Sequence, residues 1–515
     1  MKNLYNERKV SRRKFLATSA ALGMITVVPR SVLGRGYVAP SDKITMIYLG
    51  CGYQGFSDLG ALLQCPQIEI IGVADPNKQS NDYLGWGPND QRNRIRRLID
   101  EPNWFEGVTG HPGGRDVMKY VIDTYYKKNR PGYSGSCLAE EDYRELLAKV
   151  SNVDSVKITT PDHLHSYIAA DCLNRGKHII SQKPVGNKLQ EAMKVIDISK
   201  VNSNLATYIM AWGSSSNNGI NQTKAWIDAG AIGKLREIHN WSDRPFWPQY
   251  SEIPTERTPI PRGFNWDLWL GPAQWREYSP KYTHCQFRGW FEFGGGSICD
   301  MGIYSMMPVF IGLGLGSATS ASSRFSRVYG IDVDQVPRQV VNTWSYPLAG
   351  GFRFELPYKN DKIIFTWHDG GMKPNCPDGY PEDDLRVDGM MFIGEKGFIV
   401  GGVNGQNPQL IGLSAADMKK YGKITAPGMA NTREEVSSGT QRWLQGWIDR
   451  VKGGPVNPGS FDFVRELTET YTLGAVSMMR DGAKLVYDSA TRRVTNDEEG
   501  NKLLYRDTRK GWEFV

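Results

Sequence analysis

Short apolar runs of strand length alternate with helical patterns along the first part of the chain. An apolar run at 44–49 leads into a glycine-rich turn at 50–55, a helical pattern follows at 59–63, and a second apolar run at 68–74 ends at Asp75. Apolar runs of this length that are bounded by glycine are typical of buried strands. The order strand, glycine turn, helix, strand and acidic residue predicts the opening βαβ unit of a dinucleotide-binding domain.

A second βαβ unit follows after a long polar insertion at about 80–138, which contains one predicted helix from Arg115 to Lys128. The length of this insertion suits either a lid or a subunit contact. Beyond it, the pattern predicts helices at 139–150 and 168–175 and strands at 153–158 and 178–180. Both strands end in polar residues, at the edge where open α/β sheets bind ligands.

From about residue 235 the pattern becomes strand-rich, and it predicts strands at 352–356, 362–368, 390–393 and 397–400. The fold class predicted for the whole chain is therefore α/β, with an N-terminal Rossmann domain and a C-terminal α+β domain built on a large, mostly antiparallel open sheet. We expect an export signal and linker at 1–40, the Rossmann domain at 41–210, and a domain for substrate binding and oligomerisation at 211–515. Helices predicted at 440–450 and 461–480 should pack back on the first domain.

Composition excludes several classes of protein. The chain has 515 residues, of which 40% are hydrophobic and 23% charged, so it can bury a core and is not disordered. Its net charge of +7 is spread along the chain without a long Lys/Arg run, which argues against a nucleic-acid partner. The seven cysteines form no CxxC pair or Cys/His cluster, so we expect buried thiols and no metal.

The glycine turn carries the first candidate chemistry. Gly50 should permit the tight turn, Gly52 should let the backbone approach a pyrophosphate, and Gly55 should let the helix pack close to the strand. The helix N-terminus offers free N–H groups to phosphate. Asp75 should accept hydrogen bonds from the ribose hydroxyls and repel a 2′-phosphate, which favours NAD over NADP.

The N-terminal residues resemble an export signal. Ser11-Arg12-Arg13-Lys14-Phe15-Leu16 precedes an uncharged stretch that reaches Val28. That stretch is shorter than the roughly 20 residues of a spanning helix, so no stable membrane span is expected. The paired arginines resemble a twin-arginine signal, although an amphipathic first helix is an alternative. Because that route exports folded proteins, it predicts a periplasmic or otherwise exported protein whose nucleotide stays bound.

Several motifs in order resemble the Gfo/Idh/MocA oxidoreductases, the glucose-fructose oxidoreductase and inositol dehydrogenase family. They are the glycine turn, Thr160-Pro161-Asp162-His163-Leu164-His165, Gly176-Lys177-His178 and Lys183-Pro184, followed by the segments 241–248, 265–272 and 288–302. The resemblance covers nearly the whole chain after Ser41. It implies that the cofactor is held by the following residues: Gly50, Gly52, Tyr53, Gln54, Gly55, Asp75, Thr160, Pro161, His165, Gln182 and Lys183.

The resemblance also implies catalytic residues. Lys183 would lie beside the nicotinamide and the substrate hydroxyl, where a lowered pKa would let it shuttle a proton and its charge would stabilise an alkoxide. Asp300 and Tyr304, four residues apart, would share one helix face, with Asp300 accepting from a sugar hydroxyl and Tyr304 exchanging a proton. His163 and His165 have a structural interpretation as well.

The chain departs from the family at three places. Gln182 replaces the usual Glu before the lysine, and its missing charge should make the charged lysine less favourable. Tyr304 stands where inositol-type members carry His. Ser214-Ser215-Ser216 stands near where a Gln-x-Arg element is often found, so that element's role is not carried over.

The resulting prediction is an NAD(P)-dependent oxidoreductase that transfers hydride between a tightly bound nicotinamide and a hydroxyl or keto carbon of a sugar, glycoside or cyclitol. One alternative is an NAD-dependent glycosidase that uses transient oxidation and elimination. The other is a non-catalytic sugar-binding protein on the same scaffold. An open sheet has a second face that needs cover, so a homo-oligomer is also expected.

Overall fold

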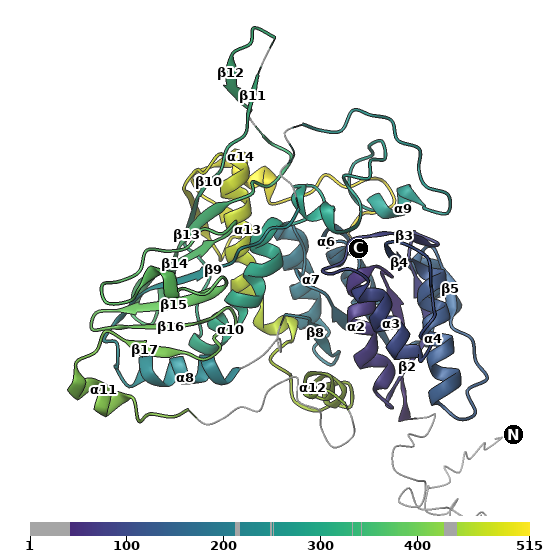
Figure 1. The fold of residues 1–515 in the computed structure, drawn as a ribbon, viewed down its shortest axis with the longest axis horizontal. Coiled ribbons are helices and arrows are strands. Elements are labelled where there is room, and N and C mark those ends of the chain that lie inside the picture. Colours follow the sequence, from purple (N-terminus) through teal and green to yellow (C-terminus); the bar gives the residue numbers. More distant parts are fainter. Residues whose placement is uncertain are drawn as a thin grey trace, which may run out of the picture. The chain divides into compact units, whose positions relative to one another are not determined.

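The computed structural model describes residues 42–211, 217–247, 250, 252–331, 333–340, 342–426 and 440–514. From Ile44 onward these residues form one compact unit built on two large sheets. Figure 1 shows the two sheets with α7, α10 and α13 between them.

The first sheet has six parallel strands in the order β5-β2-β1-β6-β7-β8. Its central strands are buried on both faces, as their continuous apolar runs predict. This is the predicted Rossmann sheet. Its strands are β1 (Ile44–Leu49), β2 (Ile68–Ala74), β5 (Leu138–Glu140), β6 (Ser155–Ile158), β7 (His178–Ser181) and β8 (Thr207–Ile209).

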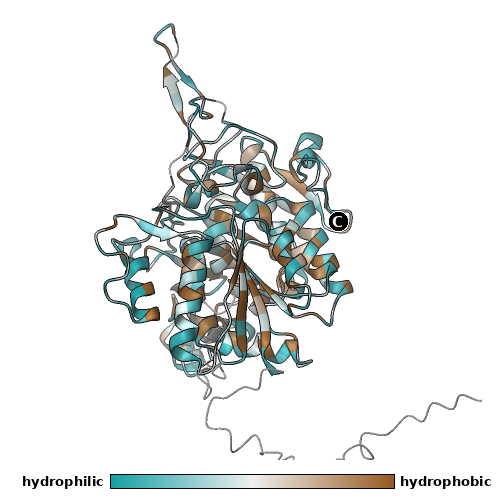
Figure 2. Ribbon diagram, turned by 90° about the vertical axis from the view of Figure 1, so that its right-hand side faces the viewer, coloured by the Kyte–Doolittle hydropathy of each residue, from teal (hydrophilic) through white to brown (hydrophobic). Residues whose placement is uncertain are grey.

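Helices flank this sheet, and Figure 2 shows its brown strands among helices with teal outward faces. Most of these helices bury an apolar stripe and leave polar residues toward solvent, whereas α6 is buried along nearly its whole length. The helices that follow the strands are α2 (Tyr53–Gln64), α5 (Tyr143–Lys149), α6 (Asp162–Asn174) and α7 (Leu189–Val201).

The insertion is a small folded layer rather than an irregular loop. It contains β3 (Ser80–Tyr83), α3 (Asp90–Ile99), β4 (His111–Gly113) and α4 (Arg115–Asn129). Helix α4 matches the helix predicted from Arg115. The helix predicted at 139–150 begins too early, because residues 138–140 pair with β2 as the edge strand β5. Asp142 then caps α5 by accepting from the Arg144 N–H, so the helix starts at Tyr143.

The second sheet has nine strands in the order β17-β16-β15-β9-β14-β13-β10-β18-β19. All its pairings are antiparallel except that of β9 with β14, so the predicted fold class is confirmed. Its strands are β9 (Leu235–Trp241), β10 (Ser320–Phe325), β13 (Gly350–Tyr358), β14 (Asp361–His368), β15 (Gly389–Gly394), β16 (Phe398–Gly402), β17 (Gln409–Ile411), β18 (Leu485–Asp488) and β19 (Arg493–Val494).

The two faces of this sheet differ. The inner face packs against α10 (Ile303–Leu313) and α13 (Arg465–Met479), and α8 (Asn217–Asp228) packs against α10. Phe352, Phe354 and Phe365 point inward and belong to a core shared with the Rossmann strands. The outer face carries polar residues such as His239 and Thr366, which are hydrogen-bonded to each other at 2.7 Å.

The C-terminal part returns to the first sheet. Helix α12 (Arg442–Val451) packs on it, and the Trp447 indole donates to the Ile179 carbonyl at 3.0 Å. Helix α13 lies against α7 on one side and β10 on the other. The shorter elements are α9 (Trp266–Leu270), α11 (Ala415–Tyr421), α14 (Glu498–Leu503) and a projecting hairpin of β11 (Tyr329–Ile331) and β12 (Pro337–Gln339), visible in Figure 1.

Candidate active site

A cleft lies at the carboxyl ends of the parallel strands, where the glycine turn meets segments of the second half of the chain. The first half contributes the glycine turn, Asp75, Thr159–Pro161, Gln182 and Lys183. The insertion contributes Tyr83, Leu84 and Trp86. The chain beyond β8 contributes, among others, Arg244, Trp269, His284, Arg288, Asp300 and Tyr304. The cleft therefore joins residues that are far apart in sequence.

Two glycines of the turn are required by close backbone approach. Gly50 has φ +90°, and a Cβ there would lie 2.5 Å from the Thr159 carbonyl carbon at the end of β6. A Cβ on Gly55 would lie 2.6 Å from the Gly50 carbonyl oxygen, so this glycine lets α2 pack against the turn as predicted. Gly52 faces the ring of Tyr83, 3.0 Å from where its Cβ would be, so the insertion covers the turn at this point.

The N-terminal end of α2 suits a phosphate group. No side chain caps the helix, and its first turn has no acidic residue, so the N–H groups there are available to an anion. The Thr160 hydroxyl, at the same cleft, has no hydrogen-bond partner among the described residues. Donors of this kind around a glycine turn fit the pyrophosphate and ribose of a dinucleotide.

Asp75 holds the glycine turn to the end of β2. Its carboxylate accepts the Cys51 N–H at 2.6 Å and the Asn77 N–H at 2.7 Å. Burial raises its pKa, and these two hydrogen bonds oppose that rise. Asp75 also lines the cleft, at the position where the sequence predicts contact with the ribose.

The three predicted catalytic residues meet at the other end of the cleft. The Lys183 ammonium forms a buried ion pair with the Asp300 carboxylate and lies 4.7 Å from the centre of the Tyr304 ring. Arg288, which sequence reasoning missed, places its Nε 3.4 Å from the same Asp300 oxygen. Asp300 is therefore shared between two cations.

The electrostatics of this group differ from the prediction. Burial is the largest single influence and opposes the charge on Lys183, but Asp300, through its charge and its hydrogen bond, and Tyr304 together outweigh it, so the pKa of Lys183 is raised. The expected lowering is wrong, because Asp300 supplies the negative charge that Gln182 lacks. Burial raises the pKa of Tyr304, whereas Lys183 and Arg288 together hold the pKa of Asp300 below its usual value in spite of burial. Lys183 and Tyr304 are thus both protonated at neutral pH.

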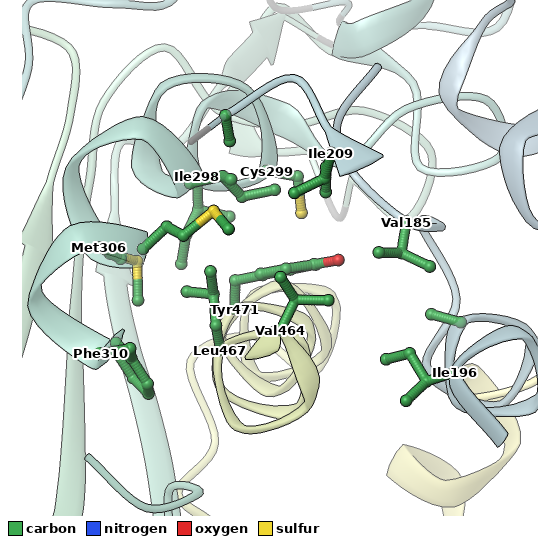
Figure 3. Packing of buried hydrophobic residues seen from close by; sticks show 14 of the residues in the cluster. Val185, Ile196, Ile209, Ile298, Cys299, Met306, Phe310, Val464, Leu467 and Tyr471 are labelled. Carbon is green, nitrogen blue, oxygen red and sulfur yellow. The ribbon is translucent and has the colours of Figure 1, made fainter. Parts of the chain in front are cut away.

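A distorted helical turn and one shared helix hold this group in place. Asp300 lies in a π-helical turn, Ile298–Gly302, that runs directly into α10. Such turns often occur at functional sites. Figure 3 shows Tyr471 of α13 lying between the side of this turn and Val185, two residues after Lys183. The Tyr471 hydroxyl donates to the Gly186 carbonyl at 3.4 Å, so α13 braces the segments that carry Lys183 and Asp300.

A second buried ion pair lies beneath the cleft, and sequence reasoning missed it. Lys157 of β6 is fully buried and places its Nζ 2.7 Å from Asp58 of α2. Asp58 also accepts from the side-chain amides of Gln54 and Gln182, at 2.8 and 2.7 Å. Because both amide nitrogens are used in this way, the two carbonyl oxygens are left for other partners. The sequence feature that could have predicted this pair is a lysine inside an otherwise apolar strand, because a buried lysine requires a buried acidic partner.

The two histidines of the TPDHLH turn are structural. The His165 ring lies between the carbonyls of Pro184 and Thr160, at 2.7 and 2.8 Å, and does not line the cleft. We expected His165 to contact the cofactor. The ring instead lies behind the cleft and supports the residues around the site. His163 lies within hydrogen-bonding distance of the Trp269 carbonyl at 3.0 Å, and burial lowers the pKa of both rings, to about 3 for His163 and about 4 for His165.

Some expectations lie outside the described residues, namely the signal at 1–40 and the Ser214–Ser216 segment. Within the described ranges all seven cysteines are free thiols, five of them buried, and no group of three or more His, Cys, Asp or Glu could hold a metal ion. No helix in the part of the chain that the structure describes is both long and apolar enough to cross a membrane.

The fold and the cleft are those of a dinucleotide-binding protein that joins a Rossmann sheet to a second, mostly antiparallel sheet. Family models for Gfo/Idh/MocA proteins match twice: "Oxidoreductase family, NAD-binding Rossmann fold" at residues 126–209 and "Oxidoreductase family, C-terminal alpha/beta domain" at residues 229–346. These two segments of the chain are therefore similar to Gfo/Idh/MocA oxidoreductases. The first match begins within α4, so the early glycine turn lies outside it.

Relatives with named functions are distant. A "Glycosyl hydrolase family 109 protein" from Shewanella baltica (strain OS195) is 24% identical over 211 residues, which is 37% of this chain and 37% of that protein. A levoglucosan dehydrogenase from Pseudarthrobacter phenanthrenivorans is 30% identical over 112 residues, 21% of this chain and 28% of that protein. These matches thus span about a third of each relative's length.

Among solved structures, the WlbA dehydrogenase from Bordetella pertussis, crystallised with NADH and UDP-GlcNAcA, superposes with a TM-score of 0.51 at 12% identity. The superposition covers 87% of this chain and 99% of that one. At this identity the likeness establishes the shared fold.

Proposed function

We propose that the protein is an NAD-dependent oxidoreductase that converts a carbinol of a sugar, glycoside or cyclitol to a ketone, or the reverse. The observation that carries the proposal is the buried Lys183–Asp300 pair, with Tyr304 beside it, in the same cleft as the glycine turn. NAD would lie along the glycine turn, Asp75 and Thr160, and when bound it would supply the hydride acceptor or donor. Asp75 disfavours the 2′-phosphate of NADP.

The residues of this chain would manage the substrate oxygen. Lys183 is an ammonium, so it stabilises negative charge on that oxygen and can donate a proton to it during ketone reduction. Tyr304 is a second O–H donor on the same side. Asp300 fixes the lysine and can accept from a neighbouring substrate hydroxyl. Alcohol oxidation in turn requires that Lys183 or Tyr304 first lose its proton.

Two measurements test this proposal. Mass spectrometry of the small molecules released on denaturing the purified protein should detect NAD. A panel of sugars, methyl glycosides and cyclitols should then give keto products, and Lys183→Ala should abolish their formation while the fold is kept. The non-catalytic binding protein would instead be supported if the parent forms no product and the Lys183→Ala variant still binds sugar normally.

The glycosidase alternative is favoured by a specific observation, the similarity to family 109 glycosyl hydrolases. In that reaction a transient ketone acidifies the neighbouring C–H, and the glycosidic bond breaks by elimination. Water then adds in place of the leaving group, and reduction of the ketone returns the cofactor to its oxidised form. The products separate the two functions. Cleaved sugar without net NADH points to the glycosidase, whereas an intact keto-glycoside points to the oxidoreductase.

We further propose that the protein binds its nucleotide in the cytoplasm, is then exported through its paired arginines, and keeps that nucleotide bound. Fractionation of cells that express Arg12→Lys/Arg13→Lys would test this, since the variant should remain cytoplasmic.

A homo-oligomer is supported by the β11–β12 hairpin, on which Tyr329, Ile331 and Val333 are 64, 70 and 95% exposed. Sedimentation with and without this hairpin would report the assembly state.

A further inference from the structure

Arg244 presents to the cleft a guanidinium that donates no hydrogen bond within the described residues. Its carbonyl oxygen accepts from the Gly370 N–H at 2.6 Å and the Ser297 hydroxyl at 3.4 Å, which fixes the backbone. Its guanidinium carbon lies 3.6 Å from the centre of the Phe246 ring and 5.1 Å from that of Trp86. Within the described residues the guanidinium donates no hydrogen bond, and the nearest carboxylate oxygen, on Asp243, is 3.9 Å from its Nε.

Aromatic stacking explains how this side chain is held but leaves its donors unused. An arginine stacked on a ring face keeps its planar edge free for a carboxylate or phosphate. Trp86 comes from the insertion, so the insertion helps to orient the arginine. The positively charged edge is therefore preformed and faces a space lined by the catalytic residues.

The substrate end of the cleft also has an excess of positive charge. Lys183, Arg244 and Arg288 line it against Asp300, whose charge is already shared by Lys183 and Arg288. Arg244 lies close enough to Asp300 to lower the pKa of that carboxyl further. A neutral sugar would leave a partly buried guanidinium without an acceptor, which is unfavourable.

We infer that the substrate is a sugar or glycoside that carries an anionic group, a carboxylate or a phosphate, bound by the Arg244 guanidinium beside the Lys183–Asp300–Tyr304 site. This inference rests on the proposed function, because it names the substrate class for the same cleft. The anionic group would face Arg244, while the carbinol to be oxidised would face Lys183.

The experiment compares matched neutral and anionic ligands. Binding to the holoenzyme is measured by calorimetry, and turnover by product detection, for methyl glycosides, the corresponding methyl uronides and the 6-phosphates in the gluco, galacto and manno series. At least one anionic ligand should bind more tightly than its neutral partner. Arg244→Met should weaken its binding by about 10- to 100-fold, the range for hydrogen bonds to a charged group, and should change neutral binding little.

Two further variants give the controls. Arg244→Lys keeps the charge without the fork, so it should recover part of the affinity if a carboxylate is held by two bonds. Arg327→Met removes an arginine that lies 5.2 Å from the Phe325 ring centre and is paired with Asp481, and it should leave all affinities unchanged. Uronides and phosphates are separate arms, so the preferred arm identifies the anion.

The inference is overturned if no anionic ligand binds better than its neutral partner. It is equally overturned if Arg244→Met weakens NAD binding and leaves sugar preference unchanged, since the arginine would then belong to the cofactor site. Direct binding keeps the two proposals distinguishable. A protein that prefers anionic sugars through Arg244 but has no turnover would contradict the proposed oxidation and support the anion site.

Discussion

The protonation state of Lys183 is decided mainly by the neighbouring Asp300. Burial is the largest single influence and favours the neutral amine, yet Asp300, together with Tyr304, reverses this and raises the lysine pKa. An ammonium at this position is ready to donate to a ketone oxygen and must lose a proton before it can accept one from an alcohol. If the protein has the proposed activity, Asp300 should set how oxidation and reduction respond to pH.

Replacing Asp300 by Asn should shift the pH profile of alcohol oxidation. In the parent the raised lysine pKa means that kcat/KM for oxidation keeps rising with pH through the neutral and mildly alkaline range. Without the carboxylate, burial and Arg288 both disfavour the ammonium, so the lysine pKa falls and the rise should level off at lower pH. Initial rates measured between about pH 6 and about pH 10 would show this shift. The control is Asp267→Asn, which removes an exposed carboxylate paired with Arg509. An unchanged profile would contradict the role given to Asp300.

Asp162 should make stability depend on pH. It is buried, its Oδ2 accepts only a 3.3 Å bond from the Gly295 N–H, and its Oδ1 has no hydrogen-bond partner among the described residues. Burial raises its pKa to about 6, against the opposing effect of Arg288 and Lys183. Because the folded pKa exceeds the unfolded value of 3.8, its favourable contribution is complete below that value and is lost as pH rises toward 6.

In the parent, the titration of Asp162 should lower the unfolding free energy by on the order of 3 kcal/mol as pH rises from 3.8 to about 6. Asp162→Asn should lack this decrease. Urea unfolding at several pH values between about 4 and 7 would measure it. The variant should be less stable than or equal to the parent at the acidic end and gain relative stability toward neutral pH. Parallel curves for the two proteins would show that Asp162 does not titrate there.

At the scale of elements, β6 and α2 are joined by a charged contact beneath the cleft. Asp58→Ala should lower the unfolding free energy by about 3–5 kcal/mol, because it leaves the Lys157 ammonium buried without its partner. Adding Lys157→Met should recover much of that loss, since an apolar chain of similar length then fills the site. Denaturant unfolding of the single and double variants gives the coupling energy.

The matched control for that cycle is the exposed pair Lys224–Asp228 on α8. Asp228→Ala should change stability by less than about 1 kcal/mol, as is usual for surface pairs. If both pairs cost the same, burial does not decide the strength of the Asp58–Lys157 contact.

The same elements show what a sequence can and cannot predict. The first βαβ unit was predictable because its strands are continuous apolar runs and because close approach requires glycine at Gly50 and Gly55. Helix α4 was predictable from its own periodicity. The edge strand β5 was not, since Leu138-Ala139-Glu140 is short, partly exposed and defined only by pairing with β2.

The candidate site divides in the same way. Lys183, Asp300 and Tyr304 were found through a family resemblance, but their ion pair and its effect on pKa depend on a contact across 117 residues of sequence. Arg244 and Arg288 lie in segments without a strong periodic pattern, where an isolated arginine is usually a surface residue. His165 was placed at the cofactor because its motif lies beside the site, yet the ring turns toward backbone carbonyls behind it.

At the scale of the whole described fold, the two sheets share one continuous core. Rossmann residues such as Ile158 and second-sheet residues such as Phe365 belong to the same buried cluster, and α13 lies within it. A core that crosses between two sheets links their unfolding, because neither sheet can expose its share without disturbing the other. We therefore expect unfolding from Ile44 onward to be a single cooperative transition in spite of its two sheets.

Tyr471 of α13 tests this link and its effect on the site. Tyr471→Ala should cost about 3–5 kcal/mol by opening a cavity in the shared core, whereas Tyr471→Phe should cost about 1 kcal/mol by losing only the hydrogen bond to Gly186. Because this side chain lies between the segments carrying Lys183 and Asp300, the alanine variant should also lower kcat, while the phenylalanine variant keeps it near the parent value. Far-UV circular dichroism and tryptophan fluorescence should report one coincident transition in each protein, shifted most in Tyr471→Ala. Two separated transitions, of which only one moves, would mean that the sheets unfold independently and that α13 braces the cleft from one side only.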